Sequence, residues 1–366
     1  MRIRIITGVV LAVFLIAAMF FPNTWITGRT TFWSEPHVKT QPTSDTSYLV
    51  ARTYSQLTDR LLTLIQAGAE TGLIRLYNYT SDAKADLARA QKDILSGTPL
   101  GAFAVYDLKL TGTQVLSYYD VSVSISYSRP PEVLSSIHQA DSAEKFSAAL
   151  TDAIKNSKSE LLVMVEYYSE KLINIPRLLT QLKLTHPDVC YGFEGYKLTL
   201  YPDHGLHRLL ALTFTYNATP GELARQRALA ESALSTLISH TAWLSGESQL
   251  RMFRDELLRL AALREPRGST EDDTPYGLLV GGHGSAFGFA STFSILCERA
   301  QIPCALVTGT YRGAPRIWNM VRLNDTWYHI DLAAENQNPA AYTYFLKTGA
   351  QMIGYDWNMS DAVFMN

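Results

Sequence analysis

The stretch GGHGSAFGFASTFSILCERAQIPC, residues 281–304, decides the fold of the C-terminal part of this chain. Three of its first four residues are glycine, and glycine clusters of this kind mark a tight turn. Small and apolar residues follow from Ala286 onward and stop before Pro303, which predicts an amphipathic helix that ends at a second turn. The helix is therefore expected to begin directly after a glycine-rich turn, with Ala286 in its first turn.

A second motif, RIWNMVRLNDTWYHID, occupies residues 316–331, and the chain closes with YFLKTG and YDW segments. These motifs and the quoted stretch resemble transglutaminase-like domains, which share the papain-like fold of cysteine catalysis. The resemblance covers residues 220–366 and implies a glycine-rich turn, a helix that carries a nucleophilic cysteine, and strands that carry a histidine and an aspartate.

The resemblance places the family's cysteine on Ala286, its histidine on Arg316 and its aspartate on Asp331. Cysteine catalysis needs a thiolate, which a helix N-terminus and a nearby imidazolium stabilise, and a histidine whose pKa lies near the working pH. Alanine carries no nucleophile, and arginine stays protonated at physiological pH, so it cannot shuttle a proton. The sequence therefore predicts a pseudoenzyme with no functional catalytic residue.

One alternative stays open at this point. Ser285 adjoins Ala286 and His283 lies three residues before it, so a rearranged site would give an exported acyl-transferase or a cysteine-peptidase-like hydrolase. Against this, one residue of offset at a helix start turns a side chain by about 100°. We therefore expect Ser285 to point away from the histidine position and His283 to belong to the turn.

The retained aspartate leads to a structural prediction. Because the planar guanidinium matches a carboxylate with two donors, we expect a salt bridge between Arg316 and Asp331 in place of the catalytic pair. The residual cleft is expected to hold a peptide, protein or cell-wall ligand without cutting it. Its candidate binding residues are Trp318, His283, Phe287 and Asn319.

The middle of the chain indicates an internal duplication. LIRLYNYTSDAKADLARAQKDIL begins at Leu73 and LLVMVEYYSEKLINIPRLLTQLKL begins at Leu161, an offset of 88 residues. Each is a β-rich run followed by a serine suited to capping and a helical pattern. With similar helices upstream and strand pairs downstream, each unit is expected to run helix, strand, helix, strand, strand. The alternation of Val121, Val123 and Ile125 predicts a sheet with one buried face.

The N-terminus predicts export. Arg2 and Arg4 precede an uncharged apolar run over residues 5–21, which as a helix spans about 26 Å. This is longer than the apolar core of a secretory signal, and positive charges keep the N-terminal side in the cytoplasm. We expect a single-pass signal-anchor in a bacterial cell membrane with the bulk of the chain extracellular; a secreted form after signal cleavage is the alternative.

Composition and cysteine spacing limit which partners and cofactors are expected. Formal net charge is −2, from 32 basic and 34 acidic residues, and no basic run stands out, so nucleic acid is not an expected partner. The three cysteines lack the spacing of a zinc site, and no cofactor or metal is implied. Cys297 and Cys304 are expected to be buried thiols, with a disulfide between them as the alternative.

The chain is expected to be α+β, with a membrane helix (1–21), a polar linker (22–47), a duplicated α/β region (48–217, units 48–129 and 131–217) and a transglutaminase-like domain (219–366).

Overall fold

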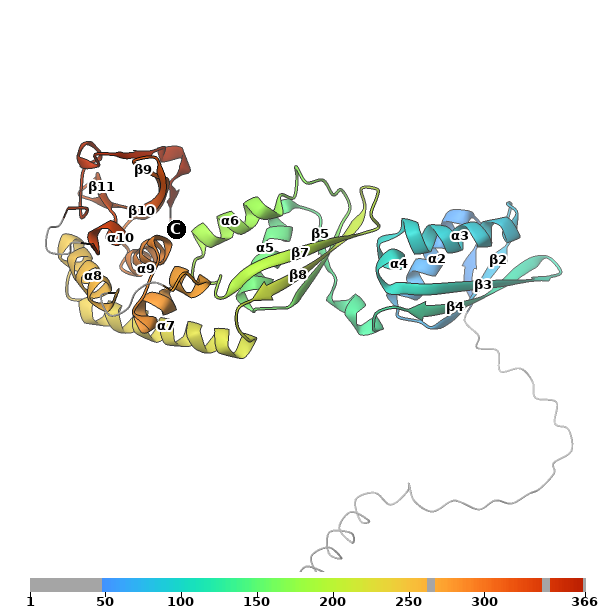
Figure 1. The fold of residues 1–366 in the computed structure, drawn as a ribbon. Helices are drawn as coiled ribbons and strands as arrows, with labels where there is room; N and C mark the ends of the chain where they lie inside the picture. The colour runs from blue at the N-terminus through green and yellow to red at the C-terminus, as the bar shows by residue number, and fades with distance from the viewer. Residues whose placement is uncertain (1–47, 262–266, 338–342, 365–366) are drawn as a thin grey trace, which may run out of the picture. The chain divides into compact units, whose positions relative to one another are not determined.

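The computed structural model describes residues 48–261, 267–337 and 343–364. The first unit is a mixed sheet that carries helices on one face (Figure 1). Its strands run in the order β1-β2-β4-β3, with β1 and β2 parallel and the other neighbours antiparallel. Its elements in chain order are β1 (Leu49–Ala51), α2 (Tyr54–Gln66), β2 (Thr71–Tyr77), α3 (Ala83–Gly97), α4 (Pro99–Ala104), β3 (Val105–Val115) and β4 (Tyr118–Tyr127).

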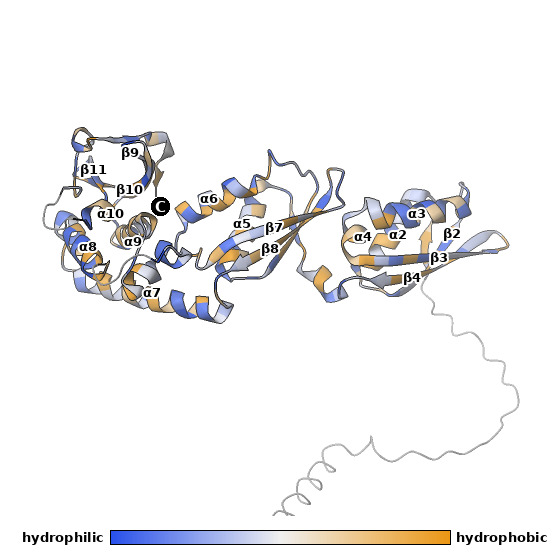
Figure 2. Cartoon of the chain, in the orientation of Figure 1, coloured by the Kyte–Doolittle hydropathy of each residue, from blue (hydrophilic) through white to orange (hydrophobic). Residues whose placement is uncertain are grey.

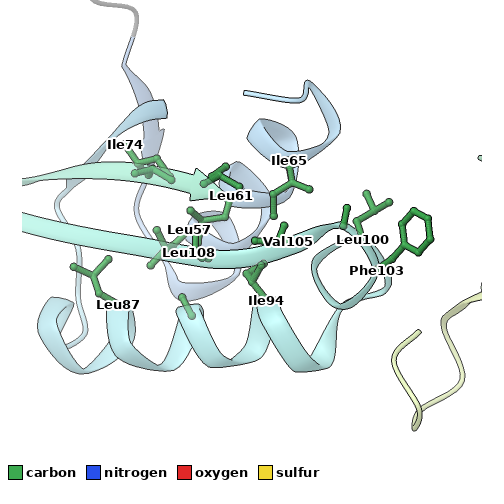
Figure 3. Packing of buried hydrophobic residues seen from close by; sticks show 14 of the residues in the cluster. Leu57, Leu61, Ile65, Ile74, Leu87, Ile94, Leu100, Phe103, Val105 and Leu108 are labelled. Carbon is green, nitrogen blue, oxygen red and sulfur yellow. The ribbon is translucent and has the colours of Figure 1, made fainter. Parts of the chain in front are cut away.

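Helix residues spaced about four apart and alternate strand residues pack together in the core of this unit, which Figure 3 shows. Helix α2 buries Leu57, Leu61 and Ile65, which recur every four residues on one side of the helix. Alternate residues of β4 face these helices, and Val121, Val123 and Ile125 are all buried, which confirms the predicted one-sided sheet.

The second unit repeats this topology. Its strand order is β5-β6-β8-β7, again with one parallel pair and two antiparallel pairs. A short 3₁₀ helix, η1 (Pro131–Ser136), precedes it. Its elements are β5 (His138–Ala140), α5 (Ala143–Lys155), β6 (Glu160–Val165), α6 (Ile175–Thr185), β7 (Phe193–Tyr201) and β8 (Arg208–Tyr216).

The two sheets correspond element by element. Tyr54 and Ala143, the first residues of α2 and α5, are 143 − 54 = 89 positions apart, close to the offset in the sequence. The expected element order was incomplete, because each unit begins with a short strand, β1 or β5, before its first helix. Three residues are too few to show the two-residue period that identifies a strand in sequence. Helix α4 of the first unit was also not expected.

The C-terminal region combines helices with a sheet ordered β11-β10-β9-β12, to which β13 adds on β9. Thr219 caps α7 by accepting from the backbone of Glu222, and Pro220 occupies the first turn, as the sequence indicates. Around α7, hydrophilic and hydrophobic residues alternate (Figure 2). The elements are α7 (Pro220–Thr241), α8 (Gly246–Ala261), η2 (Thr270–Asp273), η3 (Gly277–Gly281), α9 (Ala286–Arg299), β9 (Cys304–Tyr311), β10 (Ala314–Leu323), β11 (Thr326–Ile330), α10 (Leu332–Glu335), η5 (Gly349–Gln351), β12 (Tyr355–Trp357), η6 (Met359–Asp361) and β13 (Val363–Phe364).

Helix α9 forms the centre of this region. Every residue from Gly288 to Cys297 is buried, and the sheet covers the helix through β10 and β9. The side-chain amide of Asn319 on β10 donates to the carbonyl of Ala290, 2.9 Å away, and to the hydroxyl of Ser294, 2.8 Å away. These bonds fix the helix against the sheet. Cys297 and Cys304 are buried free thiols, as expected.

The predicted membrane helix and linker, residues 1–47, lie outside the described residues. Within the described ranges, no helix is both long and apolar enough to cross a membrane. The signal-anchor therefore stays a prediction from sequence.

Candidate functional site

Helix α9 begins at Ala286, the residue on which the sequence resemblance places the family's nucleophile. Ala286 is the first residue of the helix and Ser285 is its N-cap, whose hydroxyl accepts from the backbone N–H of Gly288 at 3.1 Å. The same hydroxyl donates to Oδ1 of Asp273 at 2.5 Å. A methyl group therefore occupies the start of the helix, and the adjacent hydroxyl is committed to capping and to a carboxylate.

His283 holds the glycine-rich turn in place. Its ring is fully buried, with Nδ1 2.5 Å from Oδ1 of Asp272 and Nε2 3.3 Å from Oε1 of Glu271. The other oxygen of Asp272 accepts from the backbone N–H groups of Gly268 and Ser269. The turn therefore packs around the histidine, which confirms that His283 belongs to the turn.

Glycine is required where this turn touches the ring. A Cβ on Gly281 would lie 2.6 Å from Nε2 of His283, closer than side-chain atoms approach in proteins. Gly282 that follows has φ of +73°, a backbone conformation that side chains disfavour. These glycines shape the approach to α9.

Arg316 and Asp331 form the predicted salt bridge. Nε of Arg316 lies 2.7 Å from Oδ2 of Asp331, and Nη2 lies 2.9 Å from Oδ1. The carboxylate also accepts from the hydroxyl of Tyr355 and from the backbone of Ala334, which makes it the N-cap of α10. Four hydrogen bonds saturate a carboxylate that is 1% exposed.

Electrostatics keep the arginine charged. Burial lowers the pKa of Arg316, but the hydrogen bonds and negative charge of Asp331 outweigh burial, so the pKa lies above its ordinary value. Burial also raises the pKa of Tyr355, and the neighbouring charge of Asp331 raises it further. The phenol therefore stays protonated and donates to the carboxylate.

His329 lies on the same side of the sheet but takes a structural position. It is buried, and its Nδ1 accepts a hydrogen bond from the indole N–H of Trp318 at 2.9 Å, so its proton is on Nε2. Burial lowers the pKa of His329 to about 4, and its ring stands edge-on to Trp357 at 4.5 Å between centroids. The imidazole is therefore neutral at physiological pH.

The four candidate binding residues have different surroundings. Trp318 is 1% exposed, and His283 and Asn319 are fully buried, so their side chains stabilise the domain and offer no surface to a ligand. Phe287 keeps exposed area and lines a cavity of about 330 Å³ together with Asp273. The ammonium of Lys183 lies 4.7 Å from its ring centroid and 2.6 Å from Oδ2 of Asp273.

Several residues that shape the site were not predicted from sequence. Tyr355 reaches Asp331 from 24 positions away, because β12 pairs with β9 beside β10. Asp272 and Asp273 belong to a polar segment, EDD, which carries no apolar periodicity. The only signal for them was an acidic cluster shortly before the glycine-rich turn. Among the residues with described positions, no group of three potential metal ligands comes together.

Comparison with known proteins gives a family for part of the chain. Residues 247–332, from the first turn of α8 to the start of α10, match the Transglutaminase-like superfamily. No curated protein matches the sequence.

One matching solved structure is described as "Crystal structure of a TGase". The identity is 12% and the TM-score is 0.25, and the match covers 54% of this chain and 59% of that one. The chain thus spans under two thirds of that relative. The superfamily match includes the positions of Ala286, Arg316 and Asp331. The protein therefore contains a transglutaminase-like domain.

Proposed function

We propose that the transglutaminase-like domain is catalytically inactive and binds or scaffolds peptide, protein or cell-wall ligands on the outside of a bacterial cell, with the N-terminal helix as its membrane anchor. The observation that best supports this proposal is the bidentate pair between Arg316 and Asp331, the two residues on which the resemblance places a catalytic histidine and its orienting carboxylate. Ala286 at the first position of α9 supports the same reading.

The pair between Arg316 and Asp331 is the reason why we expect no general base in this domain. A general base has to release and accept a proton near the working pH, and the pKa of Arg316 is raised by Asp331. The carboxylate in turn is saturated by Arg316, Tyr355 and the backbone of Ala334. Neither group has a role left in proton transfer, and both stabilise the connection between β10, α10 and β12.

The alternative is an acyl-transferase or peptidase-like hydrolase that uses a neighbouring side chain. Ser285 is the available hydroxyl, and its contact with Asp273 is the observation in its favour. A serine nucleophile needs a base that is free to take up its proton, however, and Asp273 already pairs with Lys183. The hydroxyl oxygen of Ser285 also caps α9. These contacts favour a structural serine.

An acyl-transfer assay separates the two proposals. Full-length protein is incubated with a glutamine-containing peptide and a fluorescent primary amine, and amine incorporation and peptide hydrolysis are followed together. The expected result is no turnover above the protein-free rate, for both the wild type and Ser285→Ala. Turnover by the wild type that disappears in Ser285→Ala would establish the enzyme instead.

A further inference from the structure

The guanidinium of Arg316 is only partly used by its carboxylate partner. Asp331 takes Nε and Nη2, and the Tyr355 hydroxyl lies beside the same guanidinium, whereas no described carboxylate pairs with Nη1. The side chain is 22% exposed. Because Asp331 is buried and accepts four hydrogen bonds, it holds the guanidinium in one orientation. The arginine therefore presents a fixed donor edge to solvent.

A second arginine lies in the same network. Tyr355, which donates to Asp331, packs against Tyr311 with 4.7 Å between ring centroids and the ring planes tilted by 40°. The guanidinium of Arg312 lies 5.3 Å from the centroid of Tyr311. Arg312 is exposed and has no carboxylate within ion-pair distance in the described ranges. Tyr344 completes the group, since its ring centroid lies 6.1 Å from that of Tyr355, and the neighbouring Tyr311 hydroxyl and burial raise its pKa.

The backbone supports this arrangement. The N–H of Arg312 donates to the carbonyl of Gly354 at 2.8 Å, which ties the turn between β9 and β10 to the start of β12. Gly354 has φ of +84°, and a Cβ there would lie 3.3 Å from the ring of Tyr311. Glycine thus lets the loop lie against Tyr311 and Arg312. The preceding residue, Ile353, is 84% exposed and adds an apolar side chain to the same loop.

We propose that this arginine–tyrosine edge, formed by Tyr311, Arg312, Arg316, Tyr344 and Tyr355, binds a carboxylate carried by a peptide segment. The proposal rests on the proposed function and specifies its ligand. The free Nη1 edge of Arg316 and the guanidinium of Arg312 donate to the carboxylate oxygens, and the ring of Tyr311 and the side chain of Ile353 contact an apolar neighbour in the peptide.

Charge favours a carboxylate over a phosphate. Two arginines and one aspartate give the edge a net charge of 2 − 1 = +1. A carboxylate carries one negative charge and is balanced, whereas a phosphate carries about −1.5 to −2 and is not. Asp356 does not change this balance, because successive side chains of a strand point to opposite faces and Tyr355 faces the edge.

The test uses the full-length chain and two matched peptides, acetyl-Gly-Leu-Glu-Gly-amide and acetyl-Gly-Leu-Gln-Gly-amide, with inorganic phosphate as a third probe. Binding is measured by ligand-observed NMR at low and moderate salt. The glutamate peptide is expected to bind about tenfold more tightly than the glutamine peptide, the effect of one charged hydrogen bond. Phosphate is expected to bind more weakly than the glutamate peptide.

Variants locate the binding. Arg312→Gln is expected to weaken binding of the glutamate peptide about fivefold and to leave the glutamine peptide unchanged, because only the charged hydrogen bond is lost. Arg316→Lys, which keeps the charge but loses the fork, is expected to do the same. Arg322→Gln is the matched control, an exposed arginine on β10 that stacks on Trp327, and is expected to change neither peptide. If circular dichroism shows that Arg316→Lys does not fold, the effect of Arg312→Gln alone tests whether the carboxylate binds at this edge.

The outcomes separate this inference from the function on which it rests. Equal binding of both peptides, unaffected by Arg312→Gln, would overturn the carboxylate site and leave a peptide-binding domain. Binding of phosphate as tight as that of the glutamate peptide would also overturn it. Absence of peptide binding overturns the site as well, and the acyl-transfer assay then still reports on catalytic inactivity.

Discussion

The Nε and Nη2 atoms of Arg316 lie 2.7 and 2.9 Å from the two carboxylate oxygens of Asp331, so a charged pair connects β10 to the N-cap of α10. Attraction in such a partly buried pair roughly offsets the cost of removing both charges from water. Removal of one partner is different, because the other charge stays buried without compensation.

Replacement of Arg316 by leucine should therefore destabilise the domain. Asp331 would retain only Tyr355 and the backbone of Ala334 as donors, and the free energy of unfolding should fall by about 3 kcal/mol. Urea denaturation followed by circular dichroism measures this change. Arg322→Leu, at an exposed position of the same strand, should change the free energy of unfolding by less than about 0.5 kcal/mol. Equal effects of the two substitutions would show that the pair has no structural role.

The contact between Gly281 and His283 should appear as a coupling energy. Gly281→Ala places a methyl group 2.6 Å from Nε2 of His283, so the free energy of unfolding should decrease by about 2 kcal/mol. In a His283→Ala background the ring is absent, and the same glycine substitution should cost less. A double-mutant cycle by urea denaturation measures the difference, which should be about 1 kcal/mol.

Gly221 provides the control for that cycle. It lies in the first turn of α7, and a Cβ there would meet no atom within 4 Å. Gly221→Ala should therefore be neutral or slightly stabilising in both backgrounds. Additive effects of Gly281→Ala and His283→Ala would contradict the packing of the turn around the histidine.

His329 should make stability depend on pH in the acid range. Its pKa in the folded protein is about 4, against an ordinary value of 6.5, because burial favours the neutral ring. The unfolded chain therefore binds the proton first as pH falls. The stabilisation is complete above pH 6.5 and is lost progressively down to about pH 4.

The size of this effect follows from the two pKa values. Between pH 7 and pH 5 the free energy of unfolding should fall by about 2 kcal/mol on account of this one ring. His329→Gln should reduce that difference, since glutamine does not titrate, although it should lower stability at pH 7 through the lost bond to Trp318. Urea titrations of both proteins at the two pH values measure it. An unchanged difference in the variant would rule out His329 as the source.

Sequence predicted the features that depend on short-range pattern. The start of α9, the cap at Thr219 and the buried alternation of β4 follow from local residue order. The pairing of Arg316 with Asp331 was predicted because the charges are complementary and both positions belong to one motif. In each case the deciding residues lie close together in the sequence or in a known spacing.

Contacts between residues that lie far apart in the chain could not be predicted from the sequence. Tyr355 reaches Asp331 only through the pairing of β12 with β9, and no residue pattern encodes that neighbour. Trp318 was expected to line the cleft, but packing buries it. The sequence could not decide between the two, because an aromatic residue on a strand is equally suited to a cleft wall and to a core. The short strands β1 and β5 become strands only by pairing with β2 and β6.

Introduction of a cysteine and a histidine at positions 286 and 316 tests the proposed inactivity most directly. Full-length protein with Ala286→Cys and Arg316→His is compared with the wild type and with each single variant for the rate of acyl transfer from a glutamine peptide to a fluorescent amine. We expect turnover by the double variant, and none above background by the wild type or by either single variant, because nucleophile and base have to be present together. Turnover by the wild type at a rate that the two substitutions do not increase would contradict it.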